Sequence, residues 1–189
     1  MIDSMCYSGK RIMKGGAMLI WRVNGVSQLH AYCLFCETQR CGIIAELITR
    51  NYGYRCFSPQ IIQRKWVKGV PTEKSHDWLP GYVFLYAEEE ITPAFPINGI
   101  IRCLGKGELT GHDLAFAQML YRKNGKVGNV AIMQEGNRCV ISDSSWEGLH
   151  GTICKMDRER RRCCVRFEFD GMARTIWVGY ELIETKNSG

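Results

Sequence analysis

The chain has 189 residues, of which 46% are hydrophobic and 23% charged, and its formal net charge is +6. This composition is typical of a soluble globular protein and excludes wholesale disorder and a collagen-like structure. No apolar run reaches the roughly 18 residues of a membrane-spanning helix, so we expect no membrane association. The mild basicity permits a nucleic-acid partner without requiring one.

Residues 1–29 show no periodic pattern. Their apolar stretch, 17–21, is too short for the hydrophobic part of a signal peptide. We expect either a disordered tail or a translation start at Met18, because the codons for Lys14-Gly15-Gly16 can read as a bacterial ribosome-binding sequence. Without an export signal the protein is expected in the cytoplasm, where thiols stay reduced. Its ten cysteines are therefore expected to act as small buried hydrophobic side chains.

Residues 30–124 show the pattern of an α/β domain. Apolar runs predict strands at 32–36, 54–57, 78–86 and 100–104, and an extended segment at 61–67 followed by a loop at 68–77. Thr38 is a plausible N-cap for a helix that ends at Gly53. Its buried face would carry Ile43, Ile44, Leu47 and Ile48. The spacing of Thr110 and Asp113 predicts a second helix up to 124.

Residues 125–136 are rich in Gly and Asn and are predicted to be a linker. Short strands then follow at 138–142, 151–156, 163–169 and 174–178, separated by turn residues. This spacing predicts a small β-barrel over 137–184, with 185–189 as a tail. The predicted fold class is α+β, with an α/β sandwich followed by a small barrel.

Two cysteine patterns could indicate chemistry. Cys33, Cys36 and Cys41 have spacing that suggests zinc, but a strand over 32–36 would put Cys33 and Cys36 on opposite faces. Cys154, His150 and Asp157 could supply a cysteine nucleophile, yet no metal-ligand spacing or Gly-rich phosphate loop accompanies them. We therefore expect no enzyme activity, no metal and no cofactor.

Two segments resemble the NusG-type transcription elongation factors. Leu79-Pro80-Gly81-Tyr82-Val83 is similar to the aromatic-Pro-Gly-Tyr-Val strand of that family, and Tyr32-Cys33-Leu34-Phe35 lies where the family has its first strand, with Ala31 in place of the usual Trp. In the second half, Gly148, His150 and Gly151 resemble the KOW motif, with Gly151 as its central glycine. The Leu34–Thr38 segment is closest in style to LoaP-like specialised paralogues.

The resemblance covers about residues 30–184 and implies an NGN domain followed by an SH3-like KOW barrel. It implies that the NGN domain binds the clamp helices of the largest RNA polymerase subunit. The matching positions are Tyr32, Leu79, Pro80, Gly81 and Tyr82. The alternative is that Tyr32 and Tyr82 are core residues. The family's barrel recruits a ribosomal protein, a termination factor or RNA, and we expect a monomer.

Two basic segments are candidate nucleic-acid contacts. Arg64, Lys65, Trp66 and Lys68 form a candidate DNA-contact loop, in which cations bind phosphates and an aromatic ring stacks on a base. The sharper cluster, on a turn between two barrel strands, is Lys155, Arg158, Arg160, Arg161, Arg162 and Arg166. Crowded arginines favour a phosphate-rich target such as a nascent RNA hairpin. For both segments the alternative is a solvated, non-binding surface.

The sequence thus predicts a transcription elongation or antitermination factor that binds polymerase through its first domain and nascent RNA through its barrel. The alternative is a module that couples polymerase to a ribosomal protein or termination factor without RNA specificity. That alternative predicts an exposed apolar barrel surface that uses Trp146 and Leu149.

Overall fold

The computed structural model describes residues 29–183, apart from Gly69, Lys106, Asn137 and Glu147. The fold is mixed α/β, with mostly strands and two 12-residue helices in the described residues. The expectations for 1–28 and 184–189, including the start at Met18 and the tails, lie outside the described residues.

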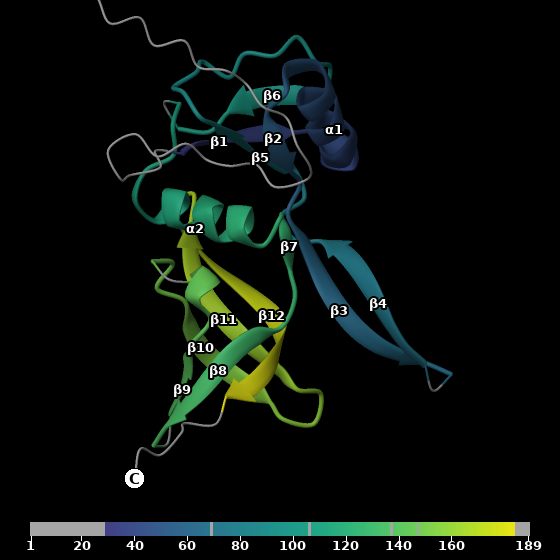
Figure 1. Ribbon diagram of the computed structural model, residues 1–189, viewed down its shortest axis with the longest axis vertical. Helices are drawn as coiled ribbons and strands as arrows, with labels where there is room; N and C mark the ends of the chain where they lie inside the picture. Colours follow the sequence, from purple (N-terminus) through teal and green to yellow (C-terminus); the bar gives the residue numbers. More distant parts are fainter. Residues whose placement is uncertain (1–28, 69, 106, 137, 147, 184–189) are drawn as a thin grey trace, which may run out of the picture.

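The N-terminal half is built on a four-stranded antiparallel sheet with a helix on each face (Figure 1). In spatial order its strands are β2 (Arg55–Phe57), β5 (Tyr82–Ala87), β1 (His30–Cys36) and β6 (Ile100–Cys103). Alternate side chains of β1 point to opposite faces. Leu34 and Cys36 pack on the α1 side, and Ala31 and Cys33 pack on the α2 side. Because both faces are covered, β1 reads as a nearly continuous apolar run.

Helix α1 (Cys41–Tyr52) follows a short 3₁₀ turn, η1 (Thr38–Arg40). It ends at Gly53, which has a φ of 75° and donates its N–H to the Thr49 carbonyl, as the sequence predicts. The expected N-cap at Thr38 is wrong, because the 3₁₀ turn occupies 38–40. Ile44 is buried, but Ile43 is 55% exposed, so the buried stripe is narrower than predicted.

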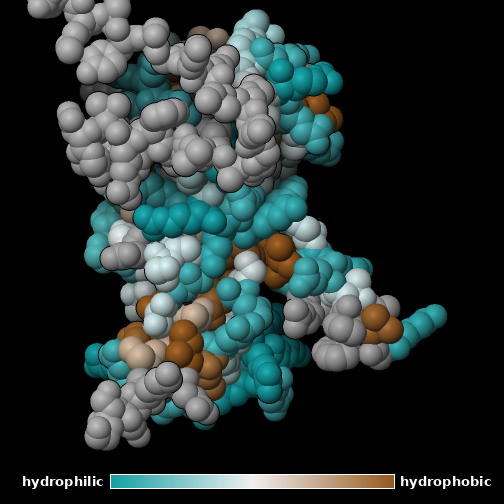
Figure 2. Space-filling view, viewed as in Figure 1, coloured by the Kyte–Doolittle hydropathy of each residue, from teal (hydrophilic) through white to brown (hydrophobic). Residues whose placement is uncertain are grey.

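Helix α2 (Gly111–Arg122) lies between the N-terminal sheet and the C-terminal strands (Figure 1). Its buried side chains are Phe116, Ala117, Met119 and Leu120. The surface that Figure 2 shows at the level of α2 is largely hydrophilic. The helix is therefore amphipathic, and its apolar side joins the two halves of the molecule.

A two-stranded hairpin, β3 (Gln60–Val67) and β4 (Val70–Asp77), projects from the side of the molecule (Figure 1). At its base, β3 pairs in parallel with β7 (Lys126–Val127). The prediction of a loop at 68–77 is wrong, because β4 occupies most of it. The β4 strand is stabilised by backbone pairing with β3 rather than by burial. Because its side chains are mostly exposed, its sequence shows no apolar alternation from which a strand could be predicted.

The C-terminal sheet consists of five strands, in the order β10 (Thr152–Asp157), β11 (Arg162–Phe169), β12 (Met172–Ile183), β8 (Val130–Glu135) and β9 (Arg138–Ile141). It curls until its two edge strands, β9 and β10, contact each other. The predicted linker at 125–136 is wrong, because it contains β7 and β8. Gly128 and Asn129 alone separate these two strands. Val127, Val130 and Ile132 are fully buried, so the segment belongs to the core.

The main hydrophobic core runs without a break from the α2 face of the N-terminal sheet into the C-terminal sheet. A second core lies between the N-terminal sheet and α1. Figure 2 shows hydrophobic side chains on the outer side of α1 and over the lower part of the C-terminal sheet.

Candidate functional site

Tyr32 lies in the core and does not belong to a docking surface. Its side chain is 1% exposed on the α1 side of the sheet. Its hydroxyl accepts a hydrogen bond of 2.9 Å from the Ile91 N–H. Burial raises the pKa of this phenol above its usual value. The prediction of Tyr32 as a polymerase contact is therefore wrong in this structure, because no partner reaches a side chain covered by α1 and the 91–100 segment.

The Leu79–Tyr82 segment forms the turn that leads into β5. Gly81 has a φ of 94°, and a Cβ there would lie 3.2 Å from the Phe35 ring, so the turn requires glycine. Its carbonyl accepts the Cys36 N–H at 2.7 Å, which joins the turn to the end of β1. Pro80 is exposed, Leu79 is buried, and Tyr82 is half-buried.

Tyr82 faces the C-terminal sheet. Its ring lies edge-on to Phe35 and to Phe169 of β11, with 5.5 Å between centroids in each pair. The predicted docking residues Leu79 and Tyr82 thus border a contact between the two halves of the chain.

An aromatic cluster forms the centre of that contact. Phe167 and Phe169 extend from the end of β11 toward α2. Phe116 of α2 stacks on Phe167 with centroids 5.2 Å apart and lies 4.9 Å from Phe169. Trp78 lies 5.4 Å from Phe167 and Phe84 lies 5.5 Å from Phe169. We call these five residues and Tyr82 the aromatic interface. Four of its rings come from the N-terminal half and two come from β11.

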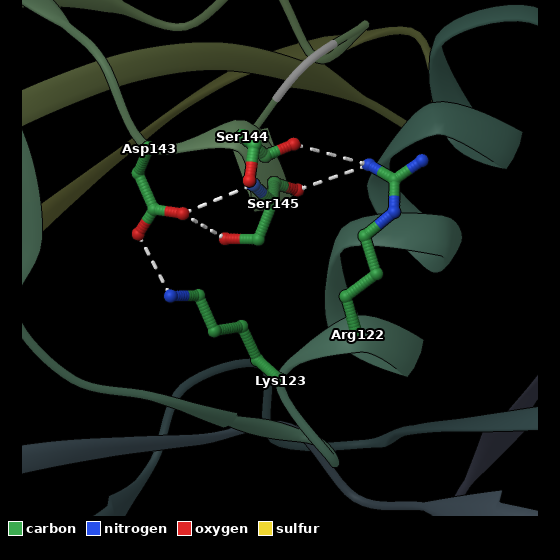
Figure 3. Close-up of polar contacts among 5 residues, drawn as sticks. All are labelled: Arg122, Lys123, Asp143, Ser144 and Ser145. Carbon is green, nitrogen blue, oxygen red and sulfur yellow. Dashed lines mark hydrogen bonds and ion pairs between the residues drawn. The ribbon is translucent and has the colours of Figure 1, made fainter.

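Polar contacts surround the C-terminal end of α2 (Figure 3). Lys123 Nζ lies 2.7 Å from Asp143 Oδ2, and Asp143 Oδ1 accepts hydrogen bonds from the Ser145 N–H and hydroxyl. Arg122 Nη1 donates to the Ser144 and Ser145 carbonyls. Burial alone would raise the pKa of Asp143, but the hydrogen bonds from Lys123 and Ser145 outweigh it and lower this pKa.

At the other end of α2, the Asp113 carboxylate accepts the Asp170 N–H at 2.8 Å. Asp113 therefore binds the β11–β12 turn. Thr110 makes no side-chain capping bond, contrary to the capping pattern read from the sequence. Both ends of α2 are thus attached to the C-terminal sheet.

The KOW-like residues occupy the β9–β10 connection, which faces α2. Gly148 has a φ of 84° and lies against Ala115, and His150 has a φ of 50°. A Cβ on Gly151 would lie 3.0 Å from Val165 Cγ1 of β11, so the strand packs closely at this position. These motif residues shape the backbone of the connection.

The predicted arginine cluster divides into two groups. Arg158, Arg160 and Arg161 are exposed on the β10–β11 turn, where Arg161 has a φ of 48°. Arg162 is 35% exposed, and its Nη2 lies 3.2 Å from Asp157 Oδ2. The Arg160 N–H and, less strongly, the Arg162 guanidinium lower the pKa of Asp157. Lys155 and Arg166 are exposed on the neighbouring strands. The turn lies at the end of β11 away from α2 (Figure 1).

The candidate DNA-contact residues do not form a loop. Arg64, Lys65 and Trp66 lie on β3, where only their backbone is described, and Lys68 is exposed in the hairpin turn. The prediction of a basic loop is therefore replaced by a projecting hairpin.

The cysteine-based alternatives place their residues apart. Cys33 and Cys36 pack on opposite faces of the sheet, as the strand periodicity predicts. The Cys154 thiol donates to the Cys164 carbonyl at 3.2 Å, and Asp157 accepts from Arg160 and Arg162. Among the described residues no group of three His, Cys, Asp or Glu side chains is arranged to hold a metal ion.

Sequence reasoning missed the contact between the two halves and one exposed aromatic residue. Trp177 of β12 is 37% exposed. Its neighbours Ile176 and Val178 are buried, and this alternation could have placed Trp177 on the outer face. The ion pair between Lys123 and Asp143 could not be predicted from the sequence, because the two residues meet only in the tertiary fold.

Neither described helix has the length and apolarity of a membrane span. No protein-family model matches the chain, and no curated protein does. Eleven solved chains match it. One comes from the structure described as "Domain interaction in Thermotoga maritima NusG" and is 15% identical, with 80% of this chain and 94% of that chain covered and a TM-score of 0.47. A NusG is thus among the structural neighbours of this chain.

Proposed function

We propose that this protein is a NusG-type transcription elongation or antitermination factor. It binds the RNA polymerase clamp through the N-terminal half and nascent RNA through the C-terminal sheet, which corresponds to an SH3-like KOW barrel. It acts by binding, without chemistry of its own, in the cytoplasm. The motif glycines support this reading, because a side chain at Gly81 would strain the backbone and a side chain at Gly151 would crowd Val165.

One observation carries the RNA part of the proposal: three exposed arginines share one turn. Arg158, Arg160 and Arg161 lie within four residues of each other, while the nearby Asp157 is engaged by Arg160 and Arg162. Like charges at this spacing repel each other unless an anion lies between them. Guanidinium groups bind phosphate oxygens in a planar, bidentate geometry. The turn therefore suits a phosphate backbone.

Polymerase binding through Leu79 and Tyr82 requires that these side chains become accessible. Tyr82 and Leu79 border the aromatic interface, and Phe169 covers the Tyr82 ring. An interface anchor must be accessible to its partner. Docking through this face therefore requires the C-terminal sheet to move away from α2, which breaks the contact between Lys123 and Asp143.

The coupling alternative requires an exposed apolar surface at Trp146 and Leu149. These side chains are 4% and 2% exposed and belong to the main core. The burial of both side chains disfavours the coupling function, and the RNA-binding experiment below decides between coupling and RNA binding.

The test is the salt dependence of RNA binding. The full chain is titrated onto an RNA hairpin with a single-stranded loop over a range of salt concentrations. Replacement of Arg158, Arg160 and Arg161 by Ala should lower the slope of log K against log salt by about 2 to 3, because each phosphate contact contributes roughly 0.7 to 0.9. Arg162 is left unchanged, since it binds Asp157.

The control is Lys126→Ala, which removes one exposed cation far from the turn and should leave the slope unchanged. If the triple variant binds the hairpin as tightly as the wild type at every salt concentration, the turn is not the RNA site. The coupling function would then be the better explanation.

A further inference from the structure

Trp177 is a large exposed aromatic side chain in the middle of a strand whose other face is the core. In β12 the buried residues Ile176 and Val178 alternate with Trp177, so its ring is on the outer face of the C-terminal sheet. It is 37% exposed. The Trp177 ring is not part of the core, so core packing does not explain a tryptophan at this position.

The strand register shows which side chains surround Trp177. Across β11 it is opposite Cys164, and the rows on either side pair Arg162 with Gly179 and Arg166 with Thr175. Lys155 of β10 pairs with Cys164 from the far side. Trp177 thus rises above small neighbours and is bordered by three cations on two strands. We call Trp177, Arg162, Arg166 and Lys155 the basic aromatic face.

The ring and the nearest cation form one platform. The Arg162 guanidinium carbon lies 5.3 Å from the Trp177 ring centroid, within the range of a cation–π contact. Asp157 Oδ2 holds the other side of that guanidinium at 3.2 Å. The planar group is therefore fixed beside the indole ring. Bases of single-stranded nucleic acids stack on aromatic rings and on guanidinium planes.

The charges around the platform match a phosphate backbone. Arg158, Arg160 and Arg161 continue the basic surface from Arg162 around the β10–β11 turn. The carboxylates nearby are Asp157, which already has two arginine partners, Glu159 on the turn, Glu168 toward the α2 end of β11, and Glu181 of β12, which accepts a hydrogen bond from Asn129. A groove that combines cations for the backbone with a ring for a base is typical of single-strand binding.

We infer that the basic aromatic face binds an unpaired segment of RNA, with one base stacked on Trp177 and Arg162 and the adjoining phosphates held by Arg166, Lys155 and the arginine turn. This inference rests on the proposed function and adds the class of target: a single-stranded segment rather than a paired stem.

The test measures binding of the full chain to unstructured oligouridine, to oligothymidine and to a blunt RNA duplex. Trp177→Ala should weaken oligouridine binding about ten-fold, because one stacked base contributes that much. It should leave the salt slope unchanged, since it removes no cation. Trp177→Phe should retain part of the affinity. Arg162→Lys keeps the charge but loses the planar group, and should weaken binding without changing the slope.

Three further measurements separate stacking from a loss of structure. Leu182→Ala removes a side chain that is 60% exposed on the same strand, away from the platform, and should bind like the wild type. Oligouridine should quench a component of the tryptophan fluorescence in the wild type that is absent in Trp177→Phe. Circular dichroism of each variant confirms folding.

The outcomes distinguish this inference from the proposed function. If the wild type binds none of the probes, RNA binding itself is wrong, and this inference and the RNA part of the proposed function both fall. If it binds RNA but Trp177→Ala and Trp177→Phe bind as tightly as the wild type, the stacking platform is wrong and the proposed function stands. Equal affinity for the duplex and oligouridine would also overturn the inference. Preference for oligothymidine over oligouridine would assign the face to single-stranded DNA and overturn the choice of RNA.

Discussion

Replacing Lys123 with Ala should loosen the contact between the two halves of the chain. The change removes a charge-assisted hydrogen bond of 2.7 Å to Asp143. The Lys123 side chain is 26% exposed and the Asp143 side chain is 14% exposed. Such a bond contributes about 1.5–3 kcal/mol when it is well shielded. Partial exposure of Lys123 and the two remaining Ser145 bonds to Asp143 reduce the expected loss to about 1–2 kcal/mol.

Urea unfolding measures this loss as a lower midpoint, and thermal unfolding should show a Tm lower by about 2–8 °C. Lys126→Ala is the matched control, because it removes an exposed lysine three residues further along the chain. A double-mutant cycle with Asp143→Ala should give a coupling of about 0.5 kcal/mol or more. If Lys123→Ala is as stable as Lys126→Ala, the ion pair does not hold the two halves together.

Three further predictions follow from single groups. Folding lowers the pKa of Asp143, so the stability that this carboxylate contributes is complete above the unfolded pKa of about 4 and is lost as the pH falls through the folded value. Asp143→Asn should therefore flatten the pH dependence of the urea midpoint between about pH 5 and about pH 2, and an unchanged pH profile would contradict the assignment. Gly81→Ala should destabilise the protein by about 1–2 kcal/mol because of its φ of 94°, whereas Gly42→Ala, where nothing lies within 4 Å, should not, and equal unfolding curves would refute this. Burial raises the pKa of Cys36 to about 12 and that of Cys163 to about 11, so iodoacetamide at mildly alkaline pH should alkylate the exposed Cys154 before Cys36 and Cys163; mass spectrometry that finds Cys36 modified earlier would contradict it.

Local signals predicted the elements that carry their own pattern. The β1 strand follows from its apolar run, α2 follows from the spacing of Thr110 and Asp113, and the end of α1 follows from Gly53. The β4 strand was missed because its pairing with β3 leaves the side chains exposed, which erases alternation. β8 was missed because Gly128 and Asn129 suggested a linker, although Val130 and Ile132 are fully buried beside them.

The candidate site shows the same limit. The arginine turn could be found from its sequence, because a run of like charges is a local feature. The burial of Tyr32 could not, since it depends on α1 covering that face of the sheet. The contact of Tyr82 with Phe169 joins residues far apart in the chain, and no local pattern encodes it.

The proposed contact between the face around Tyr82 and RNA polymerase can be measured directly. The most direct measurement is the affinity of core polymerase for the full-length wild type, Tyr82→Ala, Lys123→Ala and Tyr52→Ala. Tyr52 is the matched control, a tyrosine 42% exposed on α1, on the opposite side of the sheet.

Tyr82→Ala should lose about 2 kcal/mol of the free energy of binding to polymerase, as truncation of an aromatic anchor commonly does. Tyr52→Ala should bind like the wild type. Lys123→Ala should bind more tightly, because it favours separation of the C-terminal sheet from α2. Equal affinity of Tyr82→Ala and the wild type, with both proteins folded by circular dichroism, would contradict the claim.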